Sequence, residues 1–257
     1  MKRIPPILIC LLLTAGQLFA QNAHFTRSGT IEFERSVNMY EIIKKRMNAD
    51  NEAFFRPFVE DYMKNNPQFK KLKSTLSFNG NKTLFTPIED ESAPNNYFGD
   101  SPISTQSNTI YTDLNTDISV AQKKVFEETF LLKDSTRKIR WKITDETREI
   151  CGYTCRRANA IMLDSIYVVA FYTTKIPISG GPESFSGLPG MILGVALPHE
   201  NITWFATKVT DIILPPNTLI PPKKGKPVNN QSFKATLNGA LKDWGQWAQP
   251  YFKAFLL

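Results

Sequence analysis

The stretch Ile166-Tyr-Val-Val-Ala-Phe-Tyr172 decides the fold, because all seven of its residues are apolar or aromatic. A short apolar run without alternation is typical of a strand that is covered on both faces. The stretch before it, Gly152–Met162, also has strand character, and Leu163-Asp164 separates the two as a turn. The sequence therefore predicts a hairpin whose second arm is a central strand.

Strand-like segments continue on both sides of this hairpin, at a spacing of roughly 8–12 residues that is typical of an antiparallel meander. Asn79-Gly80 separates two of them and is a strong signal for a tight hairpin turn. The segments are residues 26–37, 72–85 on either side of the Asn-Gly turn, 109–114, 118–123, 125–132, 139–143, 191–197 and 203–214. We expect a mainly β fold: an antiparallel curved sheet, an open barrel or a sandwich.

Residues of about 38–65 interrupt the strand pattern after its first segment. Apolar side chains recur there three and four apart, from Met39 to Tyr62, as on one face of an amphipathic helix. Pro57 falls inside this stretch and removes a helical hydrogen bond. The sequence predicts a helical insert made of two helices or of one kinked helix.

The C-terminal part contains a proline-rich link and a further helix. Pro215, Pro216, Pro221 and Pro222 frame an extended link, residues 215–227. In residues of about 232–255, apolar and aromatic side chains again recur three and four apart, which predicts an amphipathic helix packed on the β body. Ser232 is its expected N-cap, and Pro250 is expected to break it.

The first twenty residues have the features of a secretory signal peptide. Two basic residues open the chain, Ile7–Ala15 is uncharged and almost wholly apolar, and Ala20 offers a small residue for cleavage. We expect residues 1–20 to be removed and residues 21–257 to form a single mainly-β domain. The remaining chain has no apolar run of membrane-spanning length, so we expect no membrane span after cleavage. The expected location is periplasmic, with outer-membrane association as the alternative.

The chain has 257 residues and a formal net charge of +7. Part of the positive excess lies in Lys223, Lys224 and Lys226, beside prolines, where it is interpreted as a solvated run. No nucleic-acid motif or interleaving of aromatic and basic residues accompanies it. We therefore exclude nucleic acid as a partner.

Cys151 and Cys155 are the two cysteines beyond the signal peptide. A pair in an exported chain favours a disulfide. However, residues four apart on a straight strand lie about 13 Å from each other, so a bridge would need a turn or bulge at Gly152 and Tyr153. A disulfide, two buried free thiols, and a redox or metal role all stay open, although the spacing matches neither a thioredoxin motif nor a zinc site. We expect no metal.

The segment Lys175–Gly190 reads KIPISGGPESFSGLPG and contains four glycines and three prolines. Prolines fix φ and glycines permit positive φ, so this loop is closely specified rather than flexible. Between two buried strands, it either plugs the end of the β structure or makes a contact surface. For a contact surface, the candidate binding residues are Pro177, Gly181, Pro182, Phe185, Gly187, Leu188, Pro189 and Gly190.

Ser186-Gly-Leu-Pro-Gly-Met-Ile-Leu193 resembles the defining element of the GLPGLI family of exported proteins from Gram-negative bacteria, with Met191 in place of the usual Leu. Further matches to the family pattern are Ile176-Pro177, Gly181-Pro182, Gly152-Tyr-Thr-Cys155 with Arg157-Ala158, and Phe171-Tyr-Thr173. The resemblance implies an exported protein of unknown biochemical function. Similar proteins are often encoded near TonB-dependent outer-membrane receptors, so the resemblance suggests such a receptor, or another envelope protein, as partner. It supplies no catalytic residues.

Catalytic groups are sparse in this sequence. A Ser-His-Asp hydrolase needs a well-held histidine, whereas His24 lies near the expected mature N-terminus and His199 lies in a turn. Glu183, the one acid of the loop, and Asp164 in the hairpin are interpreted as solvated turn residues rather than as paired carboxylates. The loop also lacks the Gly-Lys-Ser/Thr ending of a phosphate-binding loop, and we expect no cofactor.

We therefore expect an exported, non-enzymatic cell-envelope protein that binds a partner or ligand. The resemblance suggests an accessory role in outer-membrane transport. One alternative is a carrier of an apolar ligand in a β concavity, with an aromatic-lined cavity of several hundred Å³. A second alternative is a carboxylate-based hydrolase, which needs two facing acids with shifted pKa values. The question of catalysis stays open, with the balance against it.

Overall fold

The computed structural model describes residues 26–89, 102–105 and 107–257, and the expected signal peptide lies outside them. Twelve strands of these residues form one sheet, in the order β12-β6-β5-β4-β3-β2-β1-β11-β10-β9-β8-β7. All neighbours are antiparallel except β12 and β6. The mainly β prediction is confirmed, as one curved sheet. The strands are β1 Ser28–Asn38, β2 Phe69–Asn79, β3 Lys82–Ile88, β4 Asn108–Asp113, β5 Ile118–Val125, β6 Glu128–Ser135, β7 Lys142–Ile150, β8 Tyr153–Met162, β9 Ile166–Thr173, β10 Met191–Leu197, β11 Ile202–Asp211 and β12 Lys226–Val228.

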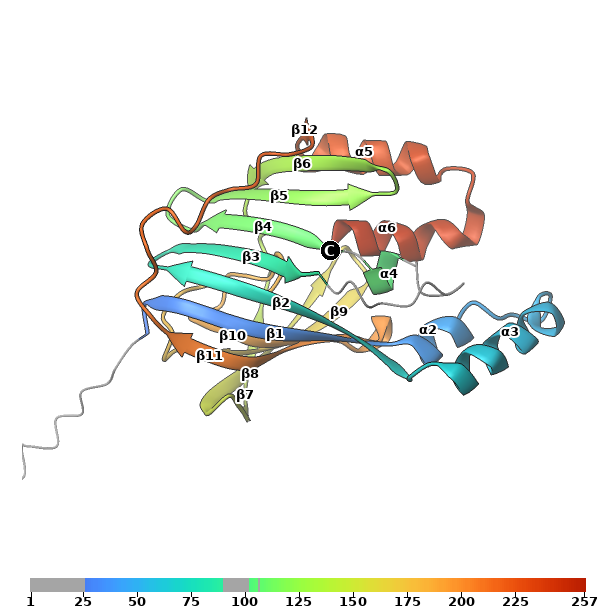
Figure 1. Cartoon of the computed structure of the whole chain (residues 1–257), viewed down its shortest axis with the longest axis horizontal. Helices are drawn as coiled ribbons and strands as arrows, with labels where there is room; N and C mark the ends of the chain where they lie inside the picture. The colour runs from blue at the N-terminus through green and yellow to red at the C-terminus, as the bar shows by residue number, and fades with distance from the viewer. Residues whose placement is uncertain (1–25, 90–101, 106) are drawn as a thin grey trace, which may run out of the picture.

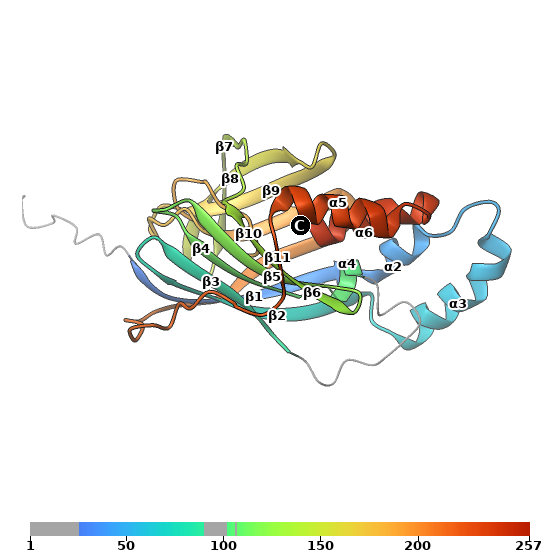
Figure 2. The same ribbon diagram turned by 90° about the horizontal axis from the view of Figure 1, so that it is seen from above.

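One short connection determines the shape of the sheet. Strands β6 and β7 follow each other in sequence but stand second and last in the sheet order. In a flat sheet, ten strand spacings of about 4.8 Å would separate them by roughly 48 Å. The connection from Ser135 to Lys142 reaches at most about 25 Å. The sheet must therefore curl, and Figures 1 and 2 show it wrapping around an interior.

Strand β1 shows how the sequence pattern orients the sheet toward this interior. Ile31, Phe33, Arg35 and Val37 are buried, in strict alternation with more exposed neighbours, as the sequence pattern predicts. This strand pairs with β2 on one side and with β11 on the other. The largest fully buried side chains of the interior are Trp204, Phe33, Phe78, Phe130, Phe185, Phe233 and Phe255.

The helical insert consists of two helices that project beyond the ends of β1 and β2 (Figures 1 and 2). The first begins after Asn38, whose side chain accepts a hydrogen bond from the N–H of Glu41. The break between the two helices lies between Lys44 and Glu52, before Pro57, which is inside the second helix. The helices of the described residues are α2 Met39–Lys44, α3 Glu52–Asn65, α4 Pro102–Thr105, α5 Asn230–Leu241 and α6 Ala248–Leu256, with 3-10 turns η2 Pro198–Glu200 and η3 Gly245–Trp247. None of them is long and apolar enough to cross a membrane.

The C-terminal helix is broken at a different point from the one predicted. The break lies between α5 and α6, whereas Pro250 lies in the first turn of α6, where its missing N–H has no helical partner to lose. The N-cap is Asn229 rather than Ser232. Ser232 occupies the third helical position, and the two side chains hydrogen-bond reciprocally as a capping box.

Two further segments differ from the predictions. Asp145, Glu146 and Glu149 lie beyond the predicted strand of residues 139–143, but the structure places them in β7, an edge strand exposed along most of its length. Exposure on both faces removes the alternation that identifies a strand, and charges on an edge discourage pairing with other chains. The end of the proline-rich link forms β12, which pairs with β6.

A pair of glycine substitutions tests this packing. A Cβ on Gly29 would lie 2.3 Å from the carbonyl oxygen of Thr210, whereas a Cβ on Gly239 in α5 meets nothing within 4 Å. Gly29→Ala should lower the free energy of unfolding by about 1–3 kcal/mol. Gly239→Ala should raise it by about 0.5–1 kcal/mol, because alanine is the better helix former. Urea unfolding measures both, and equal effects of the two substitutions would contradict the close β1–β11 contact at Gly29.

Candidate functional site

The loop between β9 and β10 folds back into the interior of the curled sheet. The N–H of Met191 donates to the carbonyl of Ile176, and that of Ile192 to the carbonyl of Gly180. The chain packs too closely there for side chains at two glycines. A Cβ on Gly181 would lie 2.8 Å from Ile192, and one on Gly190 would lie 2.1 Å from the carbonyl oxygen of Thr173. The loop is therefore a plug, which is one of the two alternatives that the sequence left open.

This position changes the candidate binding surface. Phe185 and Leu188 are each only 1% exposed, and the ring of Phe185 packs edge-on to that of Trp204 with centroids 5.9 Å apart. They are core residues, because apolar side chains on a loop inside the sheet are removed from water. Of the eight candidates, the buried ones are Gly181, Pro182, Phe185, Leu188 and Gly190, and the exposed ones are Pro177, Gly187 and Pro189. Whether the exposed ones bind a partner stays a prediction.

Glu183 lies at the inner end of this loop. It has the turn geometry that the sequence predicts, with a φ of 50°, but it is 8% exposed rather than solvated. Its Oε2 accepts a hydrogen bond of 3.0 Å from Nδ2 of buried Asn108. Burial raises the pKa of Glu183, against the opposing effects of Arg35, Asn108, Lys123 and Arg137. Asp164, by contrast, is exposed in the β8–β9 turn, as predicted.

Three basic side chains act electrostatically on Glu183. Arg35 comes from β1, Lys123 from β5 and Arg137 from the β6–β7 connection. Burial lowers the pKa of Lys123 to about 7, with a further lowering by Arg137 and an opposing effect of Glu183. Burial also lowers the pKa of Arg137 to about 10 and that of Arg35 from its ordinary value. Arg35 additionally lies over the ring of Trp204, at 5.0 Å from its centroid.

The C-terminal end of α6 meets two of these cations. Lys123 Nζ donates to the carbonyl of Phe255 at 3.0 Å, and Arg137 Nη2 donates to that of Leu256. Ser184 Oγ donates to the backbone oxygen of Leu257, the last residue of the sequence, at 3.0 Å. The last carbonyls of a helix carry partial negative charge and lack helical partners. The cations therefore hold the end of α6 inside the sheet.

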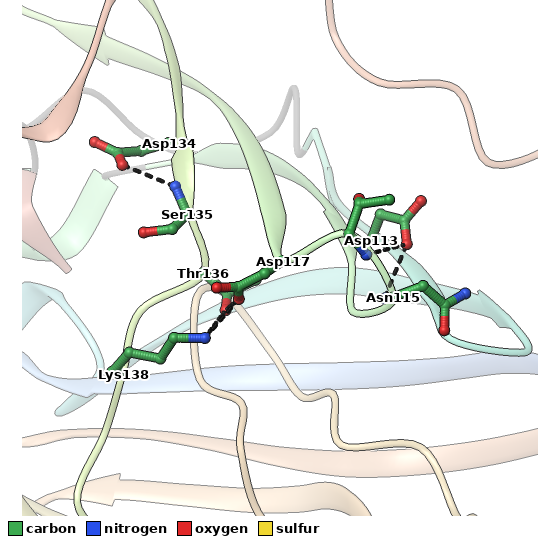
Figure 3. A network of polar contacts seen from close by, with 8 residues as sticks. Asp113, Asn115, Asp117, Asp134, Ser135, Thr136 and Lys138 are labelled. Carbon is green, nitrogen blue, oxygen red and sulfur yellow. Dashed lines mark hydrogen bonds and ion pairs between the residues drawn. The ribbon is translucent and has the colours of Figure 1, made fainter.

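Asp117 fixes the connection that carries Arg137. Its Oδ1 accepts hydrogen bonds from the hydroxyl of Thr136 and, at 2.6 Å, from Nζ of Lys138 (Figure 3). These bonds lower the pKa of Asp117. Asp113 and Asp134 hold the backbone nearby through N–H groups of their own neighbours. Because the residues on either side of Arg137 face Asp117, the side chain of Arg137 is free to reach the opposite way, toward α6.

The β6–β7 connection also borders two grooves. The first has a volume of about 480 Å³ and lies between β4–β6, the tip of the β8–β9 hairpin and the two C-terminal helices. Lys123, Arg137 and Ser184 are among its lining residues. The second, about 420 Å³, shares the connection and reaches Pro177 and Gly187 of the loop. A narrow gap of about 10 Å³ between them includes Glu183. Arg137 thus lines both grooves and the gap that includes Glu183.

The other candidate groups lie elsewhere. Cys151 and Cys155 are free thiols, so the structure does not contain the 151–155 disulfide. Cys151 lies at the β7–β8 turn and donates to the carbonyl of Ala206, whereas Cys155 points into the core. Burial raises the pKa of the Cys155 thiol to about 12. His199 is exposed in a turn, as predicted, and His24 lies outside the described residues. Within the described part of the chain, no three His, Cys, Asp or Glu side chains group as metal ligands.

Sequence reasoning missed the three cations, although a signal for two of them exists. Arg35 continues the apolar alternation of Ile31 and Phe33, and Lys123 lies in register with Ala121 and Val125. A charged residue at an inward position of an alternating strand indicates a buried charge. Arg137 lies outside any strand and carries no comparable signal.

Comparisons with known proteins match the region around the β9–β10 loop and the overall fold. A family model described as a protein of unknown function (Porph_ging) matches residues 162–194, which include β9, the plug and the start of β10. This match overlaps the stretch that resembles the GLPGLI family. No curated protein matches the chain.

Two solved structures of PNGF-II, in the P21 and C2 space groups, resemble the fold. Their TM-scores are 0.50 and 0.51, at 17% and 15% sequence identity. The similarity covers 82% and 81% of this chain, but only 33% and 32% of those chains. The protein thus spans about a third of the length of PNGF-II, and the likeness is one of fold.

The pKa of Lys123 gives a testable dependence of stability on pH. Because its folded-state pKa is about 7 and its ordinary value is 10.5, the folded chain binds fewer protons in between. Stability should therefore rise with pH in this window, by up to roughly 1.4 kcal/mol per pH unit. In urea unfolding from pH 7 to 9, the advantage of the wild type over Lys123→Met should grow with pH. The exposed neighbour provides the control: the difference from Lys124→Met should stay flat. A flat difference for Lys123→Met would contradict the burial of a titrating lysine.

Proposed function

We propose that this protein is an exported, non-enzymatic binding protein of the cell envelope, and that its ligand occupies the 480 Å³ groove beside the Thr136–Ile139 connection. The observation that carries the proposal is that apolar side chains line one groove together with buried Lys123 and half-buried Arg137. Small-molecule sites are typically concave, measure about 300–1,000 Å³, and combine an apolar lining with a few convergent polar groups.

The carrier of an apolar ligand is the nearest alternative. The volume of the groove agrees with it, since several hundred Å³ were expected. The lining favours a different ligand, because Phe233 is its one aromatic side chain among the described residues and four cations accompany it: Lys123, Arg137, Lys138 and Lys234. A purely apolar ligand would leave these charges unused.

A carboxylate-based hydrolase fits this site less well. Glu183 accepts a hydrogen bond from Asn108, and this bond and three basic side chains oppose the rise of its pKa that burial causes. The pKa of a general acid is instead raised by apolar or anionic surroundings. Asp134, on the wall of the groove, accepts hydrogen bonds from the N–H groups of Ser135 and Asn230. Both carboxylates are thus held by structural contacts.

A protein partner, such as an outer-membrane receptor, belongs to the same proposal. The second groove is bordered by Pro177 and Gly187, two of the exposed loop residues, and shares the Thr136–Ile139 connection with the first. A partner at the loop would therefore contact the same segment as the ligand. An accessory role in transport is the form of this proposal that the family resemblance favours.

Ligand recovery tests the groove. Ser135 is exposed and lines it, and Thr147 is an exposed strand residue outside it. Wild-type protein and Thr147→Trp, purified from the native envelope and denatured, should release the same small molecule for identification by mass spectrometry. Ser135→Trp should release little of it, because the indole fills the groove. Equal recovery from Ser135→Trp and Thr147→Trp, or no small molecule from the wild type, would refute this ligand site.

Export is tested independently. We expect the mature chain to begin at Gln21 and to appear in the periplasmic fraction of the native host. N-terminal sequencing and cell fractionation measure both. A chain that retains Met1 in the cytoplasm would overturn the envelope proposal without affecting the groove.

A further inference from the structure

The charge balance at the base of the groove indicates the class of ligand. We propose that the groove binds an anionic amphiphile, an apolar chain with a carboxylate or phosphate head, and that the head lies at Arg137 and Lys123 while the chain lies along Ile161 and Leu163. This inference rests on the proposed binding function and specifies its ligand.

Arg137 offers an unused donor. Its Nη2 donates to the carbonyl of Leu256, whereas its buried Nη1 has no hydrogen-bond partner among the described residues. A buried donor without a partner costs free energy, and a buried charge costs more. An anionic oxygen in the groove would supply the missing acceptor in a charge-assisted hydrogen bond, the strongest kind available to a guanidinium.

Lys123 and Arg137 also lack a full counter-charge. In the described part of the chain, neither has a carboxylate within ion-pair distance, although Glu183 acts on both at longer range. Glu183 acts on Arg35 as well, so its carboxylate is shared among three basic side chains. The backbone oxygens at the end of α6 add negative charge beside Lys123 and Arg137. An anionic head would add a counter-charge that neither Lys123 nor Arg137 has at ion-pair distance.

Part of the lining of the groove is apolar and exposed. Ile161, on β8, is 69% exposed, and Leu163, at the tip of the β8–β9 hairpin, is 39% exposed. Both line the groove together with Ile139 of the connection. Large apolar side chains along a concave surface favour an apolar ligand. A ligand in the groove therefore meets both cations and aliphatic side chains.

The rim strengthens this selection. Lys138 and Lys234 are exposed and line the same groove. Lys138 is held by Asp117, whereas Lys234 lies on α5 with its charge toward solvent. Basic residues around a concave site attract anions and raise their local concentration.

The test titrates the purified exported chain with four probes by calorimetry: dodecanoate, dodecyl phosphate, dodecanol and acetate. At least one of the two charged dodecyl compounds should bind about tenfold or more tightly than dodecanol, since a hydrogen bond to a charged group contributes that much. Acetate should bind weakly, because it lacks the chain. The comparison of dodecanoate with dodecyl phosphate shows which head is preferred.

Matched variants assign each end of the ligand. Arg137→Gln should remove the preference for the charged probes, whereas Arg140→Gln, an exposed arginine of the same connection, should keep it. Ile161→Ser should weaken all dodecyl probes, whereas Ile213→Ser, at a side chain that is 93% exposed and outside the groove, should weaken none. If Arg137→Gln does not fold, the preference of the wild type for charged over uncharged dodecyl probes still tests the anionic head. The comparison of Ile161→Ser with Ile213→Ser still tests the apolar chain.

Dodecanol binding as tightly as both charged probes, or equal effects of Arg137→Gln and Arg140→Gln, would overturn the anionic head. Equal effects of Ile161→Ser and Ile213→Ser would overturn the apolar chain. These results leave the proposed binding function standing, because it fails separately, when Ser135→Trp and Thr147→Trp release the same amount of native ligand.

Discussion

The β6–β7 connection is the constraint on which the rest of the structure depends. Six residues must join strands near opposite ends of the sheet, so the sheet curls until their ends come within reach. The curl creates an interior, and the β9–β10 loop and the end of α6 fill it. The same connection carries Arg137 into that interior, because Asp117 binds Thr136 and Lys138 on its other side. Shape and electrostatics thus follow from one segment.

The interior is unusual in its charge. Curling the sheet brings inward-facing Arg35 and Lys123 from distant strands toward the same loop. The single carboxylate of Glu183 interacts electrostatically with both. Buried cations need acceptors, and the terminal carbonyls of α6 supply some of them. The helix is therefore held by electrostatic contacts as well as by Phe255, which is 2% exposed. Among the described residues, the Nη1 of Arg137 has no hydrogen-bond partner, and Arg137 lines the groove.

The sequence predicted the elements better than their assembly. Alternation located β1, and Asn79-Gly80 located the β2–β3 hairpin, because these signals are local. The apolar run at Ile166–Thr173 correctly indicated a strand buried on both faces. The charged edge strand β7 was missed, since a strand exposed on both faces shows no alternation. The cluster around Glu183 could not be predicted, because its members are distant in sequence and meet only when the sheet curls.

The motif that carries the family resemblance is therefore better explained by packing than by binding. Gly181 and Gly190 are required where the backbone passes too close for a Cβ, and Phe185 and Leu188 fill the core. Such residues specify the plug in any protein that shares it. Ligand selection, on our proposal, depends instead on residues around the plug: Arg137 on the connection, and Ile161 on the hairpin tip. Because those positions lie outside the closely packed loop, they are free to differ while the plug and the curled sheet stay the same.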